Sequence, residues 1–192
     1  MVIGLTGKYC AGKSVVANIL VPKGWAVIDV DSLGHDALVS RAEEVLAAFG
    51  PAVRGADGAV DRRALGRIVF RDPGALARLE AIVHPVMKEE VRRIIARTPG
   101  NVIVNAALLH RMGLETLCNA VICVRAPLLL RLARAMRRDR LRLGDAMARL
   151  RAQKGICPQF NDRAVDTYTV RNRGSMRSLQ RRVERIAAGL RG

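Results

Sequence analysis

The sequence predicts an α/β fold in which a five-stranded parallel sheet is flanked by helices. Short apolar runs alternate along the chain with stretches of helical periodicity, as is typical of parallel strands joined by helical crossovers. Near the start, a strand, a glycine-rich loop and a helix follow one another before Pro22 and Gly24. With 192 residues, of which 50% are apolar, the chain can bury a sizeable core and is not expected to be disordered.

Each strand is expected where a short apolar run is bounded by polar residues or glycine. These runs lie at residues 2–5, 26–28, 102–104, 120–124 and 167–170, of which the last is the weakest. Helical patterns fill the gaps, at residues 15–20, 42–49, 63–70, 73–82, 85–96 and 128–138. A closing helix has one apolar face, formed by Leu179, Val183, Ile186 and Leu190.

The loop after the first strand carries the strongest functional motif. Residues 7–14 read Gly-Lys-Tyr-Cys-Ala-Gly-Lys-Ser and match G-x-x-x-x-G-K-[ST], the phosphate-binding loop (P-loop) of nucleoside-triphosphate enzymes. Successive backbone N–H groups that end at a helix N-terminus can hold a polyanion. Lys13 would reach the β- and γ-phosphates as a catalytic residue, and the Ser14 hydroxyl would ligate Mg²⁺. The predicted phosphate-binding residues are Gly7, Lys8, Tyr9, Cys10, Ala11, Gly12, Lys13, Ser14 and Val15.

Two residues within this loop each have two possible roles. Lys8 adds a charge that either contacts a phosphate or points to solvent. Cys10 is either a neutral filler of the loop or, beside a helix N-terminus, an oxidisable thiol.

Two carboxylates follow the second predicted strand, at Asp29 and Asp31. Ligands of open α/β sheets bind outside the carboxyl ends of the strands, so both would face the nucleotide crevice. If the strand stays extended, the two side chains point the same way; Asp31 can equally cap a helix that begins at Ser32. One interpretation makes Asp31 the base that deprotonates an attacking hydroxyl, while Asp29 helps to hold Mg²⁺ through water.

The spacing of the strands predicts two further parts of the molecule. Residues 32–96 separate the second and third strands, which is far more than one crossover requires, so an inserted helical subdomain is expected. A shorter, arginine-rich helical stretch at residues 140–159 is expected to form a lid over the phosphates. Residues 1–31, 97–139 and 160–192 would then form the nucleotide-binding core.

Composition narrows the class of partner. The formal net charge is +16, and the basic residues are dispersed along the chain rather than gathered in a tail. Aromatic residues make up only 3%, too few for base-stacking platforms, so a substrate with several phosphates is favoured and no specific nucleic acid is expected. A nucleotide-dependent nucleic-acid-binding protein remains an alternative, as does a P-loop kinase acting on another nucleotide or small alcohol.

The sequence has no early basic-then-apolar signal pattern and no long apolar run, which predicts a cytoplasmic protein without membrane contact. The four cysteines, Cys10, Cys118, Cys123 and Cys157, lack C-x-x-C spacing, so reduced thiols and no zinc site are expected. We expect a monomer or a weak homo-oligomer.

Motifs along nearly the whole chain resemble those of the dephospho-CoA kinase family. They keep its order and approximate spacing: Ile3-Gly4-Leu5-Thr6-Gly7, Gly12-Lys13-Ser14, Val27-Ile28-Asp29-Val30-Asp31, Asp57-Gly58-Ala59-Val60-Asp61-Arg62, Val69-Phe70, His84-Pro85, Leu108-Leu109, Arg138-Asp139 and Asn172. The resemblance implies a fold of the nucleoside-monophosphate-kinase type, with a helical acceptor (CoA) subdomain and a lid. It also implies transfer of the γ-phosphoryl group of ATP to the ribose 3′-hydroxyl of dephospho-CoA, the last step of coenzyme A biosynthesis.

The same resemblance implies roles for individual residues. Asp31 corresponds to the catalytic base, Arg62 to an acceptor-side arginine, and Arg138 to a lid-hinge arginine that neutralises the transferring phosphates. Asn172 is expected near the adenine. His84 either contacts the acceptor or forms a rigid corner with the proline that follows it.

The chain departs from the family pattern at two places. Lys8, Tyr9 and Cys10 occupy the middle of the loop, where the family usually has more glycine. Asn105 follows the third strand, where the family commonly has an acidic residue. Asn105 carries no charge, although its side-chain carbonyl can orient Mg²⁺-bound water.

Overall fold

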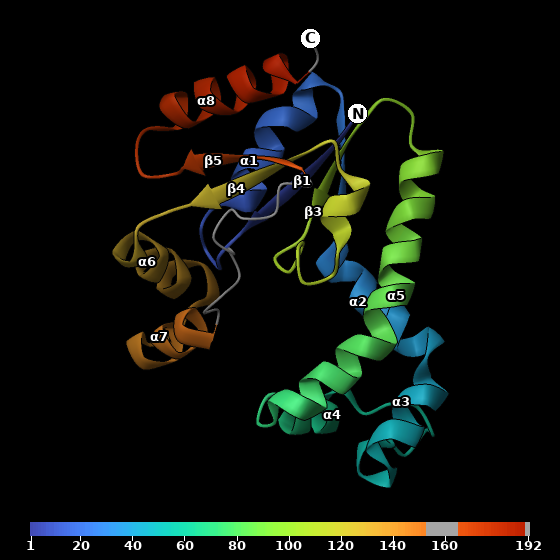
Figure 1. Ribbon diagram of the computed structural model, residues 1–192. Coiled ribbons are helices and arrows are strands. Elements are labelled where there is room, and N and C mark those ends of the chain that lie inside the picture. Colours follow the sequence, from blue (N-terminus) through green and yellow to red (C-terminus); the bar gives the residue numbers. More distant parts are fainter. Residues whose placement is uncertain (153–164, 191–192) are drawn as a thin grey trace. The chain divides into compact units, whose positions relative to one another are not determined.

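A computed structural model describes residues 1–152 and 165–190 of the chain (Figure 1). Its five strands are parallel and lie in the order β2-β3-β1-β4-β5. They are β1 (Val2–Gly7), β2 (Trp25–Asp29), β3 (Asn101–Asn105), β4 (Ala120–Arg125) and β5 (Asp166–Arg171). The weak fifth strand pairs with β4 from Asp166 to Arg171. The predicted five-stranded parallel sheet is therefore confirmed.

Helices connect the strands and follow the last of them. The α-helices are α1 (Lys13–Leu20), α2 (Val30–Ser40), α3 (Ala42–Phe49), α4 (Arg62–Val69), α5 (Pro73–Arg97), α6 (Leu128–Asp139), α7 (Leu143–Ala152) and α8 (Met176–Gly189). Short 3₁₀ turns are η1 (Val21–Lys23), η2 (Pro51–Val53) and η3 (Leu114–Leu117). No helix within residues 1–152 and 165–190 is long and apolar enough to cross a membrane.

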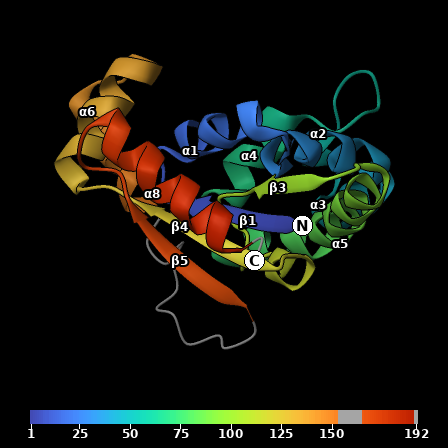
Figure 2. The same cartoon turned by 90° about the horizontal axis from the view of Figure 1, so that it is seen from above.

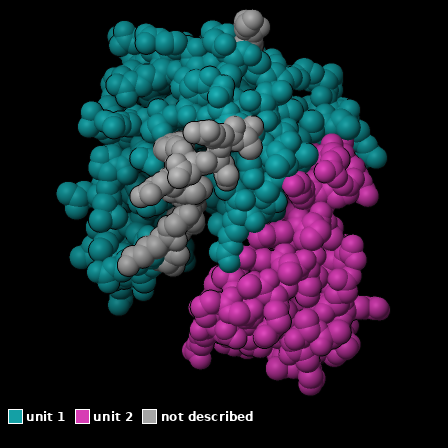
Figure 3. Space-filling model, in the orientation of Figure 1, with its two compact units in different colours: residues 1–29, 94–192 teal, residues 30–93 magenta. Residues whose placement is uncertain are grey.

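The chain forms two compact units, coloured separately in Figure 3. Unit 1 contains residues 1–29 and 94–192, and therefore the whole sheet with α1, α6, α7 and α8. Unit 2 contains residues 30–93, and therefore α2, α3, α4 and most of α5.

In unit 1, helices α1 and α8 contact each other and pack on one face of the sheet (Figure 2). Val16 and Leu20 of α1 join Leu179 and Val183 of α8 in the core cluster. Burying such side chains contributes about 1.5–3 kcal/mol each. This packing fixes α1, and with it the phosphate loop, against the central strand β1.

The segment after β3 covers the other face of β1. A Cβ on Gly4 would stand 3.0 Å from a methyl carbon of Leu109 and 3.1 Å from the Cys118 sulfur, so any larger residue would force these side chains to shift by a few tenths of an ångström. Burial, together with the nearby Glu115 carboxylate, raises the pKa of the Cys118 thiol to about 12. Cys118 therefore stays a neutral packing residue, and its sulfur donates to the Leu114 carbonyl at 3.3 Å.

Unit 2 has its own apolar core, built from all of its helices. Buried Val45, Leu65, Val69 and Ala75 form its centre, from α3, α4 and α5. Asp61 caps α4: its Oδ1 accepts hydrogen bonds from the backbone N–H groups of Arg63 and Ala64 at 2.8 and 3.1 Å. Leu38 of α2 packs against the same cluster.

The predicted break between residues 82 and 85 is wrong, because α5 continues through Pro85 as one helix. Proline removes one backbone hydrogen bond and usually kinks a helix, and the ribbon of α5 bends partway along its length (Figure 1). Buried residues on both sides of the proline, Ala75, Met87 and Val91, hold the two halves in place. His84 therefore lies within a helix and not at a corner between two helices.

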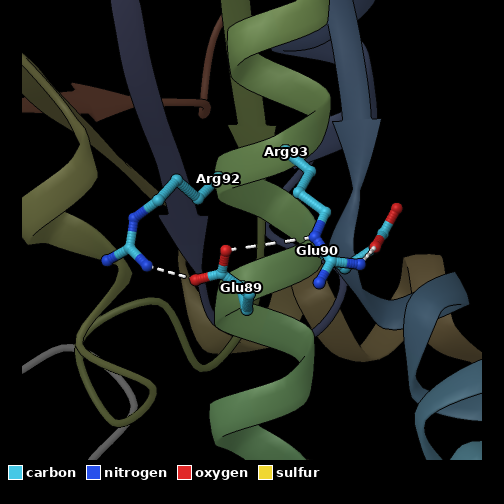
Figure 4. A network of polar contacts seen from close by, with 4 residues as sticks. All are labelled: Glu89, Glu90, Arg92 and Arg93. Carbon is cyan, nitrogen blue, oxygen red and sulfur yellow. Dashed lines mark hydrogen bonds and ion pairs between the residues drawn. The ribbon is translucent and has the colours of Figure 1, made fainter.

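A surface ion-pair network on α5 marks the solvated side of this helix (Figure 4). Arg92 pairs with Glu89, and Arg93 pairs with Glu90 at 3.4 Å and with Glu89 at 4.0 Å. The side chains are roughly half-exposed, so each pair contributes at most about 0.5 kcal/mol.

Candidate active site

The phosphate loop joins β1 to α1 in the predicted order. Gly7 ends the strand with φ +155°, and Gly12 precedes the helix with φ +100°. A Cβ on Gly7 would stand 2.5 Å from the Val124 carbonyl oxygen, and a Cβ on Gly12 would stand 2.1 Å from Asn172 Nδ2. Both positions therefore require glycine, for backbone conformation as well as for space.

Cys10, in the middle of the loop, adopts the left-handed conformation with φ 58°. This conformation costs a residue with a Cβ roughly 1–2 kcal/mol. The Cys10 side chain is buried against Ala135 of α6 and Ala146 of α7. The contact between loop and helices compensates for the strained backbone.

Side chains from distant parts of unit 1 hold the carbonyl groups of the loop. Arg131 Nε donates to the Tyr9 carbonyl at 2.8 Å. Arg134 Nη1 donates to the Cys10 and Ala11 carbonyls at 3.4 and 3.3 Å. Asn172 Nδ2 donates to the Ala11 carbonyl at 2.9 Å, and its Oδ1 accepts from Arg134 at 3.2 Å. Because these donors fix the carbonyls, they also fix the orientation of the loop's peptide groups.

The sequence analysis missed Arg131 and Arg134. A signal was available, because residues 131, 134 and 138 lie at i, i+3 and i+7 of one helix and therefore share a face. Arg131 is only 6% exposed, which is unusual for an arginine and consistent with a structural hydrogen bond.

A pocket of about 570 Å³ opens beside the loop. Of the predicted residues it is lined by Cys10, Ala11, Gly12, Lys13, Ser14, Val15, Arg138 and Asn172. The lining also includes Arg134, Arg137 and Met176, which the sequence analysis did not select; Gly7, Lys8 and Tyr9 do not line it. Among the described residues, four cationic side chains and no acidic one therefore meet at this pocket. Such a lining suits a polyanion.

Lys13 and Ser14 begin α1 at the edge of this pocket. The ammonium group of Lys13 donates to the Gly7 carbonyl at 3.2 Å, and Ser14 is exposed. The first N–H groups of a helix have no acceptor within the helix. The pocket thus combines a helix N-terminus with a lysine, a favourable arrangement for phosphate oxygens.

The end of α6 carries the predicted lid-hinge arginine. Arg138 Nε and Nη2 donate to Asp139 Oδ1 and Oδ2 at 2.8 and 3.1 Å. The guanidinium carbon lies 5.1 Å from the ring centroid of Tyr9, whose hydroxyl donates to Asp139 Oδ2. Arg138 therefore lies over the phosphate loop as well as at the pocket.

The predicted lid begins just after this cluster. Residues 143–152 form α7, in which Ala146 and Leu150 are buried. Residues 153–159 of the predicted lid lie outside the described residues. Helix α7 contacts α6.

The backbone around the two carboxylates after β2 differs from both conformations that the sequence predicted. Asp29 is the last residue of β2, and α2 begins at Val30, so Asp31 lies in the first turn of the helix. Asp31 is therefore neither on an extended strand nor the cap of a helix that begins at Ser32. The helix begins at Val30 because Val30 and Ala37, seven residues apart, share its buried face. Asp29 and Asp31 are both exposed.

Asn105, the residue that pairs in register with Asp29, ends β3. It is only 9% exposed, and its Oδ1 has no hydrogen-bond partner among the described residues. A buried acceptor of this kind normally has a partner. No group of three or more His, Cys, Asp or Glu side chains in the described ranges could hold a metal ion by itself.

Unit 2 has a pocket of its own, of about 620 Å³. Arg62 and Arg63, at the start of α4, line it together with apolar residues that include Leu65, Val69 and Phe70. Phe70 is 85% exposed, although it is aromatic. His84, which was also predicted on the acceptor side, does not line this pocket.

Comparisons with known proteins agree with this architecture. A sequence model of the dephospho-CoA kinase family matches residues 1–177. A dephospho-CoA kinase of Anaeromyxobacter dehalogenans is 41% identical over 198 residues, which cover 100% of this chain and 92% of the relative. A solved structure from Thermus thermophilus has a TM-score of 0.81 at 37% identity, covering 100% of this chain and 98% of that one. The dephospho-CoA kinase of Campylobacter jejuni has a TM-score of 0.60 at 25% identity, covering 98% and 96%.

Proposed function

Because the chain belongs to the dephospho-CoA kinase family, we propose that unit 1 binds ATP in the pocket at its phosphate loop and that unit 2 binds the acceptor. The chain is an enzyme, a kinase that uses ATP to phosphorylate dephospho-CoA in coenzyme A biosynthesis. The observation that carries the proposed ATP site is the pocket lining, in which Lys13, Arg134, Arg137 and Arg138 meet no acidic side chain from the part of the chain that the structure describes.

On the ATP side, the residues act by position and charge. Phosphoryl transfer needs its reactants in line and its negative charge neutralised, and little else from the protein. Lys13 contacts the β- and γ-phosphates, the first N–H groups of α1 bind phosphate oxygens, and Arg138 neutralises charge on the group in transfer. Asn172 holds the loop and lies at the pocket wall, and the exposed Met176 offers an apolar contact to the adenine.

On the acceptor side, Asp31 accepts the proton of the ribose 3′-hydroxyl as its oxygen attacks the γ-phosphorus. A new O–P bond forms while the bond from the γ-phosphorus to the bridging oxygen breaks, and ADP leaves with that oxygen. Arg62 and His84 help to seat dephospho-CoA, and the apolar wall beside Arg62 suits the less polar part of this substrate.

The oxygen donors of unit 1 fit Mg²⁺. This ion prefers oxygen ligands and keeps several waters, so it needs few protein groups when phosphates are present. Ser14 would be the direct ligand, with Asp29 acting through water and the unpartnered Asn105 Oδ1 accepting from such a water. When bound, Mg²⁺ neutralises charge on the β- and γ-phosphates.

An acceptor screen tests the proposal. ADP release with ATP should be fast with dephospho-CoA and slow with other nucleotides and small alcohols. Asp31→Asn should lower kcat while ATP binding is kept, and Arg62→Ala should in addition raise the KM for dephospho-CoA. Arg92→Gln, in the exposed network of Figure 4, is the matched control and should behave like the unmodified enzyme.

Two outcomes would contradict these assignments. Equal rates with unrelated acceptors would exclude dephospho-CoA as the specific substrate. A full kcat in Asp31→Asn would show that the base lies elsewhere. A gel shift with nonspecific duplex at moderate salt, measured in parallel, tests whether the charge of +16 also attracts nucleic acid.

A further inference from the structure

Three side chains close a ring of contacts between the phosphate loop and the end of α6. Asp139 accepts two hydrogen bonds from the Arg138 guanidinium, at 2.8 and 3.1 Å. Tyr9 donates its hydroxyl to the same carboxylate. The Tyr9 ring lies under the guanidinium, 5.1 Å from its central carbon. We call these residues, Tyr9, Arg138 and Asp139, the loop–hinge cluster.

The backbone beside this cluster is strained at both of its ends. Within residues 1–152 and 165–190, the non-glycine residues with positive φ are Cys10 at 58° and Arg140 at 52°. Cys10 directly follows Tyr9, and Arg140 directly follows Asp139. Strained residues persist where the surrounding contacts determine the backbone, and they gather at functional sites.

We propose that Tyr9 and Asp139 are positioning residues that hold the Arg138 guanidinium at the phosphate pocket. The inference rests on the proposed role of Arg138. Nε and one N–H of Nη2 are engaged by Asp139, whereas Nη1 makes no hydrogen bond to the described part of the chain. The donors that remain are those available to phosphate oxygens, and Arg138 lines the pocket that would contain them.

The physical reason is the freedom of an exposed arginine. The Arg138 side chain is 61% exposed and, without partners, would sample many rotamers. Binding the phosphate would then cost the conformational entropy of all but one of these rotamers. Two parallel hydrogen bonds to the two oxygens of the Asp139 carboxylate fix the plane of the guanidinium. The aromatic ring beneath it adds a cation–π contact of about 0.5–1 kcal/mol at an exposed site. Tyr9 contributes to both contacts, because its ring stacks and its hydroxyl orients Asp139.

The proposal gives Tyr9 a function in the middle of the loop, where it departs from the family pattern. Glycine at this position could provide neither the ring nor the hydroxyl. The Tyr9 carbonyl is itself fixed by Arg131 at 2.8 Å, so the ring projects from an anchored backbone. Arg149 Nη1, 4.0 Å from Asp139 Oδ2, connects the cluster to α7.

The test uses graded variants and steady-state kinetics with ATP and dephospho-CoA. Tyr9→Phe keeps the ring and removes the hydroxyl, so kcat should fall about 5-fold. Tyr9→Leu and Asp139→Asn should lower kcat roughly 10- to 100-fold, as expected when a charged group is misplaced by about 1 Å. The KM for ATP should change less than 3-fold in each. Tyr168→Phe on β5 and Asp166→Asn are matched controls and should keep the full rate.

A double-mutant cycle separates positioning from general stability. In an Arg138→Ala background, Tyr9→Phe and Asp139→Asn should cause no further loss of kcat, because the group that they orient is absent. Losses that multiply in this background would overturn the proposal. Variants that melt at lower temperature but keep the full kcat at 25 °C would overturn it as well.

The same series distinguishes failure of the inference from failure of the proposed function. If Arg138→Ala itself keeps the full rate, the role of Arg138 is wrong and the positioning proposal falls with it. If Arg138→Ala is slow while Tyr9→Phe, Tyr9→Leu and Asp139→Asn are all unaffected, the proposed function stands and only the positioning role is overturned.

Discussion

Single residues of the phosphate loop show how local backbone geometry serves the pocket. Gly7 and Gly12 adopt positive φ where any side chain would meet Val124 or Asn172. Cys10 adopts positive φ although it carries a side chain, and its burial against Ala135 and Ala146 compensates for the strain. Arg140 has the same backbone strain but is exposed.

We therefore expect Arg140→Gly to stabilise the protein. Relief of the left-handed strain contributes roughly 1–2 kcal/mol, and the greater freedom of glycine in the unfolded chain costs about 0.5–1 kcal/mol. The net gain should be about 0.5–1 kcal/mol in urea unfolding monitored by circular dichroism. Arg137→Gly, one turn earlier inside α6, should instead destabilise by up to about 1 kcal/mol. Equal losses in both variants would contradict this account of Arg140.

Lys13 gives the second prediction at this scale. Lys13→Ala should keep the fold, because the side chain is only partly buried and lines the pocket, and should lower activity by about 10²- to 10³-fold, typical for removal of one charge-stabilising donor. Lys23→Ala, which removes an exposed ion pair to Glu184, is the control and should retain activity. Near-normal turnover of folded Lys13→Ala would remove the phosphate-loop assignment.

At the scale of elements, helix starts place the functional side chains. The strand β2 passes directly into α2, which puts Asp31 in a first helical turn, where a carboxylate is favoured by the helix dipole. The N-cap Asp61 fixes the start of α4 and therefore the position of Arg62. Backbone N–H groups, of Ala64 first and then Arg63, lower the pKa of the Asp61 carboxyl.

The Asp61 cap predicts a pH dependence. Because the pKa is lower in the folded state, the ionised cap stabilises the protein fully above the ordinary pKa of 3.8 and loses this effect as the pH falls through the lowered value. Asp61→Asn keeps an N-cap that does not titrate. The melting temperatures of the two proteins should therefore show different slopes below about pH 4. Parallel curves would show that this cap contributes no pH dependence.

At the scale of the whole molecule, the sequence predicted the features that short stretches of neighbouring residues encode. Apolar runs revealed the strands, and the spacing of Gly7, Gly12, Lys13 and Ser14 revealed the loop. Helical spacing places Arg131 and Arg134 on the same face as Arg138, but it could not identify their partners, which are backbone carbonyls about 120 residues away in the sequence. Tertiary packing also decided where α2 begins and why α5 continues through its proline.

The last prediction concerns the movement of α7. Apart from Ala146 and Leu150, this helix is mostly exposed and rich in arginine, with Arg149 and Arg151 in its last turn. Few buried contacts imply a low free energy of local opening, and phosphates that attract the arginines would raise it. We expect amide hydrogen exchange in residues 143–152 to slow when a bisubstrate analogue binds, whereas exchange in residues 183–187 of α8, which pack on the sheet away from the pocket, should not change. Closure would also keep water from the γ-phosphate and so limit hydrolysis of ATP. Equal protection of residues 143–152 in both states would identify α7 as a static part of unit 1, and closure over the phosphates would then have to be abandoned.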